Sequence, residues 1–182
     1  MNKIPTLFLR DPEHRAHLTR DINPAAAWVL DGDAVPTRKF DGTCVMLDDT
    51  GSWWARREVK PGKATPPGYQ EIEHDPATGK TMGWEPLRQS AFAKVFATVA
   101  DIPSAPGTYE LLGPKINGNP EGLHAHHLVR HGASALQGVP LDYDGLASWL
   151  AGRDYEGIVW HHPDGRMAKL KWRDFPEPGN TA

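Results

Sequence analysis

Short runs of apolar residues, separated by glycine, proline and charged residues, divide the chain into many small segments. The 18 glycines and 17 prolines favour strands joined by turns over a helical bundle. The predicted strands are Ala27–Leu30, Arg38–Leu47, Ser52–Val59, Thr108–Leu112, His127–His131, Glu156–His161 and Met167–Trp172.

Two hairpins are predicted from the residues between these strands. The sequence Asp48-Asp49-Thr50-Gly51 separates Val45–Leu47 from Trp53–Ala55, and Asp and Gly are favoured where paired strands reverse direction. The sequence His162-Pro163-Asp164-Gly165 has the same place between the last two strands.

Two further segments have the apolar spacing of about 3.6 residues that is typical of helices. They are Glu85–Ala100 and Tyr143–Ala151, the second with Asp142 or Asp144 as its N-cap. Because Lys60–Lys80 is rich in proline, glycine and charge, we expect a long surface loop there.

Together these elements predict a single α+β domain of antiparallel sheets with flanking helices. A length of 182 residues fits one domain, or at most two small ones. We expect residues 1–175 to form the domain and residues 176–182 to form a flexible tail.

Charge and cysteine content narrow the class of protein. The formal net charge is −3, so a phosphate-binding site must come from local clusters of cations. No run of about 18 apolar residues is present, and the N-terminus lacks the apolar core of a signal peptide. Cys44 is the single cysteine and cannot form an internal disulfide. We therefore expect a cytoplasmic protein with no membrane partner.

Lys39 and Asp41 are the first candidates for chemistry. Two residues apart on one strand, they are expected to share a face, and Gly42 allows close approach of a ligand. The same pair is also typical of a plain surface ion pair. Arg56 and Arg57 point to opposite faces of the next strand, so only one of them can face a site shared with Lys39.

Carboxylates and lysines in later strands add to this set. Glu110 lies inside an apolar strand, where a carboxylate needs a partner or a metal. Glu156 opens a strand, and Lys169 and Lys171 share one face of its hairpin partner. Two neighbouring ammonium groups repel each other unless an anion lies between them, so this pair is a candidate phosphate clamp. A solvent-facing strand that carries two lysines is the simpler interpretation. Histidines 124, 126, 127 and 131 also allow a zinc site, but no matching cysteine is present, so ordinary polar or loop histidines are the favoured interpretation. His131 is equally a candidate for contact with RNA or nucleotide.

The sequence Lys39-Phe40-Asp41-Gly42 resembles the Lys-x-Asp-Gly signature of covalent nucleotidyltransferases, which include ATP-dependent ligases and mRNA capping enzymes. The other blocks follow in the order of that superfamily: Arg56, Glu110, Glu156-Gly157-Ile158-Val159 and Lys169-Leu170-Lys171. A narrower resemblance, to a small 5′-to-3′ RNA ligase family with vertebrate and phage members, rests on further matches. These are Trp54-Ala55-Arg56, Gly83-Trp84, Asn117-Gly118-Asn119-Pro120, His131-Gly132-Ala133 and Trp160-His161.

This resemblance implies a minimal adenylation domain and a three-step reaction. Lys39 would attack the α-phosphorus of ATP to form lysyl-AMP, the AMP would pass to a 5′-phosphate end of RNA, and a 3′-hydroxyl would displace it. Mg²⁺ or Mn²⁺ would assist, with Glu156, Asp41 and Glu110 as the implied metal ligands.

The resemblance also implies roles for the remaining residues. Lys169 and Lys171 would hold the α-phosphate, and Arg56 and Glu110 would contact ribose, phosphate or a metal-bound water. Thr37 would contact the adenine edge and Val159 would pack on the base, although strict strand alternation points to Ile158 instead.

Other functions fit the same motifs. Only 11 residues follow Lys171, so no C-terminal OB-fold is expected, which disfavours capping enzymes and most DNA ligases. A DNA nick-sealing ligase shares the chemistry, and a non-catalytic module for nucleotides or RNA ends shares the residues. If a phage encodes the chain, its compartment is the host cytoplasm. The motifs imply no obligatory protein partner.

Overall fold

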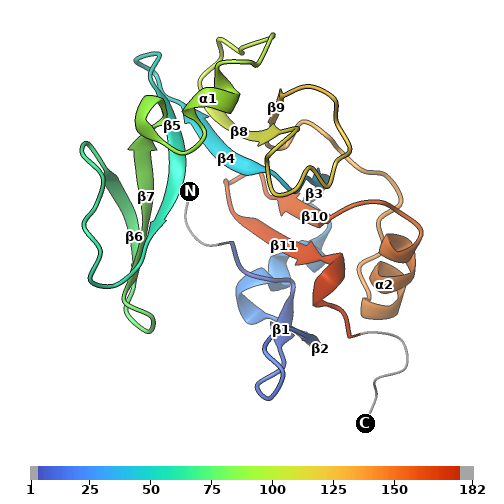
Figure 1. Ribbon diagram of the computed structural model, residues 1–182. Coiled ribbons are helices and arrows are strands. Elements are labelled where there is room, and N and C mark those ends of the chain that lie inside the picture. Colours follow the sequence, from blue (N-terminus) through green and yellow to red (C-terminus); the bar gives the residue numbers. More distant parts are fainter. Residues whose placement is uncertain (1–3, 177–182) are drawn as a thin grey trace. The chain divides into compact units, whose positions relative to one another are not determined.

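The structure is a computed structural model that describes residues 4–176 (Figure 1). It is a small α+β protein with antiparallel sheets and few helices. The predicted tail, residues 176–182, lies outside the described residues except for Pro176. Within the described part, none of the helices has the length and apolarity needed to span a bilayer.

The described chain divides into two compact units. Unit 1 is Asp41–His131, and unit 2 combines Ile4–Phe40 with residues 132–176. Unit 1 is thus one continuous stretch that interrupts the sequence of unit 2, and the boundary falls inside the Lys-x-Asp-Gly motif.

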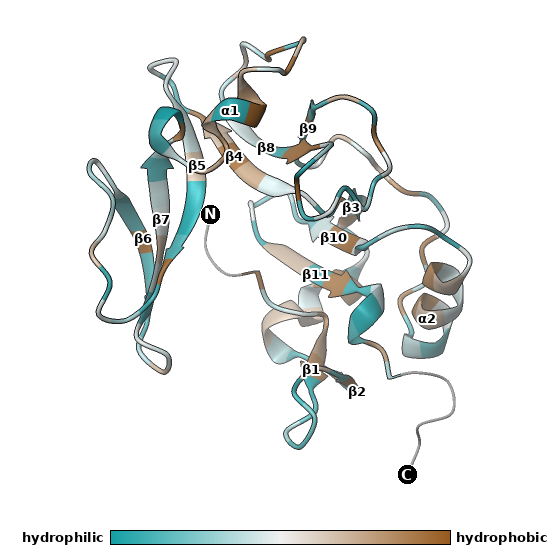
Figure 2. Cartoon of the chain, in the orientation of Figure 1, coloured by the Kyte–Doolittle hydropathy of each residue, from teal (hydrophilic) through white to brown (hydrophobic). Residues whose placement is uncertain are grey.

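Unit 1 is built on a six-stranded antiparallel sheet with the strand order β6-β7-β5-β4-β8-β9. Its strands are β4 (Thr43–Leu47), β5 (Trp53–Val59), β6 (Gln70–Asp75), β7 (Lys80–Pro86), β8 (Gly107–Leu112) and β9 (His127–Arg130). A 3₁₀ turn at Leu87–Gln89 and the single-turn helix α1 (Ala93–Phe96) follow β7. The central strand β4 is apolar, whereas the edge strand β6 is hydrophilic (Figure 2).

The core of unit 1 packs the apolar side chains of the sheet against the segment after β7. Its buried members are Val45, Leu47, Leu87, Phe96, Val99, Tyr109, Leu111 and Ile116.

Unit 2 contains a three-stranded antiparallel sheet, in which β10 lies between β3 and β11 (Figure 1). The strands are β3 (Val35–Lys39), β10 (Gly157–His161) and β11 (Met167–Lys171), with the separate hairpin β1 (Phe8–Arg10) and β2 (Leu18–Ile22). Helix α2 (Tyr143–Ala151) and 3₁₀ turns at Pro24–Asp31 and Trp172–Asp174 complete it.

One face of the three-stranded sheet forms the core of unit 2. Ile158 and Trp160 of β10, with Ala168 and Leu170 of β11, are fully buried against α2 and the N-terminal segment. The alternate residues of these strands therefore face the other way.

Both predicted hairpins are confirmed. Val45 is opposite Ala55 and Leu47 is opposite Trp53, and β10 pairs along its length with β11. Helix α2 has the predicted bounds, and the carboxylate of Asp142 accepts a hydrogen bond from the amide of Gly145 as its N-cap.

Three predicted elements are wrong. Glu85–Ala100 is not one helix, because its first residues end β7, where Glu85 pairs with Ala55. Ala27–Leu30 is part of a 3₁₀ helix that Asn23 caps and Gly32 ends in a left-handed conformation. Lys60–Lys80 contains β6 and is therefore more than a loop.

A fourth prediction, a single strand over Arg38–Leu47, is also wrong. The chain forms β3 up to Lys39 and β4 from Thr43, which pair with different sheets. Asp41 consequently lies in the connecting turn and does not share a strand face with Lys39.

Candidate active site

The register of the three-stranded sheet gathers predicted site residues on the face opposite the core. Gly157 of β10 lies between Lys39 of β3 and Lys171 of β11. Residues directly opposite each other in antiparallel strands share a face. Both lysines therefore stand on either side of a residue that has no side chain.

Gly157 is required by close packing. A Cβ at this position would overlap the backbone carbonyl oxygen of Leu170. The glycine of the Glu-Gly-Ile-Val block thus allows β10 and β11 to approach each other closely.

Glu156 joins the two lysines. Its Oε2 accepts a hydrogen bond from Nζ of Lys39, and its Oε1 lies 2.6 Å from Nζ of Lys171. The Glu156 side chain is 8% exposed, and the side chains of Lys39 and Lys171 are 21% and 17% exposed. A buried carboxylate is tolerated when it is paired in this way. Unit 2 therefore assembles the predicted nucleophile, a carboxylate and a second cation.

The next level of the same face holds three more predicted residues. Val159 lies between Thr37 of β3 and Lys169 of β11. Strict alternation had favoured Ile158 as the residue facing the base, but Ile158 is fully buried in the core. Val159 is the one that shares a face with the lysines.

Thr37 is more enclosed than the resemblance implies. The residue is 2% exposed, and its hydroxyl donates a hydrogen bond to the carbonyl of Val159 at 3.1 Å. Nε2 of His161 lies 3.1 Å from the same hydroxyl oxygen. The role of Thr37 at the adenine edge stays a prediction.

In unit 1, the Asp41-Gly42 turn is held by three polar side chains. Glu121 accepts a hydrogen bond from the amide of Asp41 at 3.1 Å, and Glu110 Oε1 accepts one from the amide of Gly42 at 3.1 Å. Asn117 donates to the Asp41 carboxylate at 3.0 Å and to the carbonyl of Gly42 at 2.7 Å.

The glycine in this turn is also a steric requirement. A Cβ at Gly42 would overlap the backbone carbonyl oxygen of Leu111 and the side chain of Leu112. The motif glycine therefore lets the backbone lie against β8, where Glu110 reaches its amide.

Glu110 has a second partner that sequence reasoning did not identify. Its Oε2 lies 2.7 Å from Nε2 of His131, and Nδ1 of His131 lies 2.9 Å from the hydroxyl of Thr108. Both carboxylate oxygens are thus engaged within unit 1. The sequence favours an ordinary polar histidine at His131, with contact to RNA or nucleotide as the alternative. Thr108 and Glu110 alternate on β8, and this spacing was the signal that one partner could contact both.

Arg56 of β5 carries a buried donor without a partner. Its Nε is shielded from solvent and has no hydrogen-bond acceptor among residues 4–176. A desolvated guanidinium nitrogen without an acceptor is unfavourable, and a bound anion would supply the acceptor that it lacks.

The predicted metal ligands are divided between the units: Glu156 lies in unit 2, and Asp41 and Glu110 lie in unit 1. Within residues 4–176, no group of three or more His, Cys, Asp or Glu side chains is arranged to hold a metal ion. The metal and nucleotide assignments stay predictions.

Comparison with known proteins gives one consistent family. Residues 89–175 match the family model of RNA ligase 1. The proteins named RNA ligase 1 from Pongo abelii and Rattus norvegicus are each 25% identical to this chain over 255 aligned positions, which cover 92% of this chain and 78% of the relative. RNA ligase 1 of Danio rerio is 40% identical over 73 residues, which cover 35% of this chain and 22% of the relative. The resemblance to RNA ligases that the motifs predicted is therefore confirmed: this chain is similar to proteins named RNA ligase 1.

Proposed function

We propose that this chain is an ATP-dependent RNA ligase with a nucleotidyltransferase fold. It joins a 5′-phosphate end and a 3′-hydroxyl end of RNA through lysyl-AMP and RNA-adenylate intermediates. The contact of Lys39 with Glu156, and of Glu156 with Lys171, is the observation that carries this proposal.

Lys39 is the nucleophile of the first step. Its Nζ must lose a proton before it can attack, and the contacting carboxylate of Glu156 is the nearest acceptor for that proton. The Nζ–phosphorus bond then forms at the α-phosphate of ATP, and the bond to the pyrophosphate leaving group breaks.

Lys171 and Lys169 stabilise the phosphate during this step. They share the face of Lys39, and ammonium groups placed there offset the negative charge that spreads over the transferring phosphoryl group. Val159 of the same face packs on the base, and Thr37 lies beside it. In unit 1, Arg56 binds a ribose or phosphate oxygen.

The same lysine face serves the later steps. AMP passes from Lys39 to the 5′-phosphate end of the RNA, and the 3′-hydroxyl of the second end then displaces AMP to form the phosphodiester bond. The first two transfers occur at the α-phosphorus of ATP. In the third, the 3′-hydroxyl attacks the adjacent phosphorus of the RNA 5′-phosphate and AMP leaves, so the cations of this face act on two neighbouring phosphorus atoms.

A single carboxylate fits the way in which Mg²⁺ binds beside nucleotides. This ion commonly takes one or two carboxylates, with waters and substrate phosphates as its other ligands. Glu156 would hold Mg²⁺ or Mn²⁺ in unit 2. One carboxylate oxygen would then bind the ion and give up its contact with a lysine ammonium group. The bound ion would neutralise phosphate charge.

Intact-mass measurement after incubation with ATP and Mg²⁺ tests the proposal. We expect the parent protein to gain one AMP and Lys39→Ala to gain none. The matched control is Lys94→Ala, an exposed lysine on α1, which should gain AMP like the parent.

Two outcomes contradict the proposal. An AMP adduct on Lys39→Ala would place the nucleophile elsewhere. A folded parent that gains no mass with ATP, GTP or NAD⁺ would leave a nucleotide-binding module without the chemistry.

A further inference from the structure

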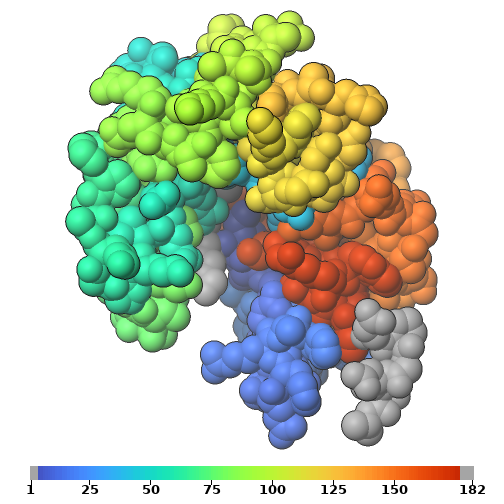
Figure 3. Space-filling model, viewed as in Figure 1, coloured from blue at the N-terminus to red at the C-terminus, as the bar shows by residue number. Residues whose placement is uncertain are grey.

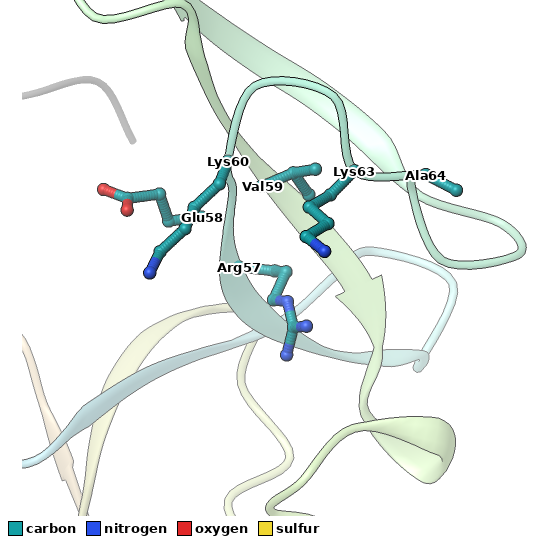
Figure 4. A pocket seen from close by; sticks show the side chains of 6 residues that line it. All are labelled: Arg57, Glu58, Val59, Lys60, Lys63 and Ala64. Carbon is teal, nitrogen blue, oxygen red and sulfur yellow. The ribbon is translucent and has the colours of Figure 1, made fainter.

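A basic pocket lies at the end of β5 in unit 1. It is formed by the last residues of β5 and the start of the β5–β6 connection (Figure 4). The residues that line it are Arg57, Glu58, Val59, Lys60, Lys63 and Ala64. All but Val59 are exposed, and this stretch, teal in Figure 3, is part of the visible surface of unit 1.

A tight turn separates the two lysines of this pocket. The amide of Lys63 donates a hydrogen bond to the carbonyl of Lys60 at 3.1 Å, and Gly62 has a φ of +73°. Proline followed by glycine at the centre of such a turn is the preferred sequence of a type II turn. The backbone therefore fixes two lysines at the two ends of one tight turn.

The charge of the pocket is positive after its ion pairs are counted. Glu58 is paired with Lys80 at 3.0 Å, and Arg57 lies 3.8 Å from Glu85. Neither Lys60 nor Lys63 has a side-chain hydrogen bond or salt bridge to any residue from 4 to 176. Figure 4 shows Lys63 and Arg57 on one side of the strand and Lys60 with Glu58 on the other.

The exposure of the pocket indicates a polymeric ligand. Sites for small molecules bury most of their ligand between apolar walls, whereas this pocket has exposed, charged walls. Lysines on an open surface are typical of contacts with a nucleic-acid backbone, which position a strand without reading its sequence.

We propose that Lys60 and Lys63, with Arg57 beside them, bind backbone phosphates of the RNA strand that is to be joined. This inference rests on the proposed RNA ligase function and deepens it, because it assigns a docking surface for RNA outside the lysyl-AMP site. The contacts are electrostatic and independent of sequence.

The test compares RNA affinity in Lys60→Gln/Lys63→Gln with that of the parent and of Lys94→Gln. Lys94 is an exposed lysine of the same unit that does not line the pocket. The probe is a fluorescent, 5′-phosphorylated single-stranded RNA, titrated without ATP at several salt concentrations. Arg57 is left unchanged because its loss would leave the buried carboxylate of Glu85 without its neighbour.

Each phosphate contact with a single strand contributes about −0.7 to the slope of log affinity against log salt concentration. Loss of the two lysine contacts should therefore make this slope less negative by about 1.4. Affinity near 0.1 M salt should fall by about tenfold or more. An unchanged slope in the double variant overturns the proposal, and so does an equal change in Lys94→Gln, because RNA would then respond only to total charge.

Formation of lysyl-AMP separates this proposal from the proposed function. The double variant should gain AMP as the parent does, because neither lysine belongs to the Lys39 cluster. If the parent gains no AMP, the ligase proposal fails; the RNA titration still decides on the pocket.

Discussion

His131 and Glu110 form a pair that connects the end of β9 to the motif turn, with Nε2 of the histidine 2.7 Å from Oε2 of the carboxylate. The other carboxylate oxygen accepts the amide hydrogen of Gly42. The side chains are 23% and 13% exposed, so solvent replaces their hydrogen bond only in part. His131 therefore positions Glu110, and through it the backbone of the Asp41-Gly42 turn.

Replacing His131 by Phe should loosen this turn. Removal of a hydrogen bond to a charged group costs about 1.5–3 kcal/mol, which corresponds to about ten- to 150-fold faster hydrogen exchange at the Gly42 amide. His131→Gln, which can still donate to Glu110, should restore most of the protection. Exchange at Gly42 that is equally slow in His131→Phe would contradict the positioning role.

Arg56→Met should separate stability from activity. The buried Nε has no acceptor among the described residues, so its removal should leave the free energy of unfolding unchanged or raise it by up to about 1 kcal/mol. The rate of lysyl-AMP formation should fall at least about tenfold, since an Arg contact to a charged group contributes about 1.5–3 kcal/mol. Denaturant unfolding and intact-mass kinetics measure the two effects.

Arg56→Lys is the matched control for this prediction. It keeps the charge but loses the planar fork, so we expect an intermediate rate. A large loss of stability in Arg56→Met, with an unchanged rate, would instead identify Arg56 as a structural residue.

Gly157→Ala should disrupt the junction of β10 and β11. The added methyl group would overlap the carbonyl of Leu170, and overpacking of this kind costs about 1–3 kcal/mol or more. Thermal unfolding should show a lower Tm, and lysyl-AMP formation should fall because Gly157 separates Lys39 from Lys171. Gly152→Ala in the same unit has open space around it and should change neither quantity.

Asp48 should make the first hairpin sensitive to acid. Hydrogen bonds from the Thr50 hydroxyl, the Trp54 indole and the Ser52 amide lower the pKa of Asp48 from 3.8 to about 2. A carboxyl whose pKa is lower in the folded state stabilises that state above its unfolded pKa and loses this effect as the pH falls to about 2. The difference in Tm between the parent and Asp48→Asn should therefore be full at pH 5 and vanish near pH 2. A difference that is constant over this range would show that the pKa is not lowered.

Prediction from the sequence succeeded for elements whose local residue pattern matches the packing that they have in the folded protein. The β4–β5 hairpin has alternating residues on both sides of a strong turn, and α2 has a capping aspartate and apolar residues on one side. Glu85–Ala100 failed because Met82–Pro86 pairs with β5, and this long-range pairing outweighs the local helical spacing. β6 was missed because an exposed edge strand of polar residues carries no apolar pattern.

The candidate site was predictable in part for a similar reason. Spacing alone places Lys169 and Lys171 on one face of a strand, and the motif resemblance adds Lys39 and Glu156. The register that sets Gly157 between the lysines, and the contact of His131 with Glu110, depend on pairing between distant strands. Local spacing carries no information on such pairing.

The interruption of unit 2 by unit 1 also sets an order of events during synthesis. A chain emerges from the ribosome N-terminus first, and compact units fold as they become complete. All strands of the six-stranded sheet lie in Asp41–His131, so they are available while β10 and β11 are still to be made. β3, which ends at Lys39, obtains its neighbour β10 only afterwards. Lys39 therefore lacks its neighbours in the three-stranded sheet until β10 and β11 have been synthesised, well after the strands of unit 1.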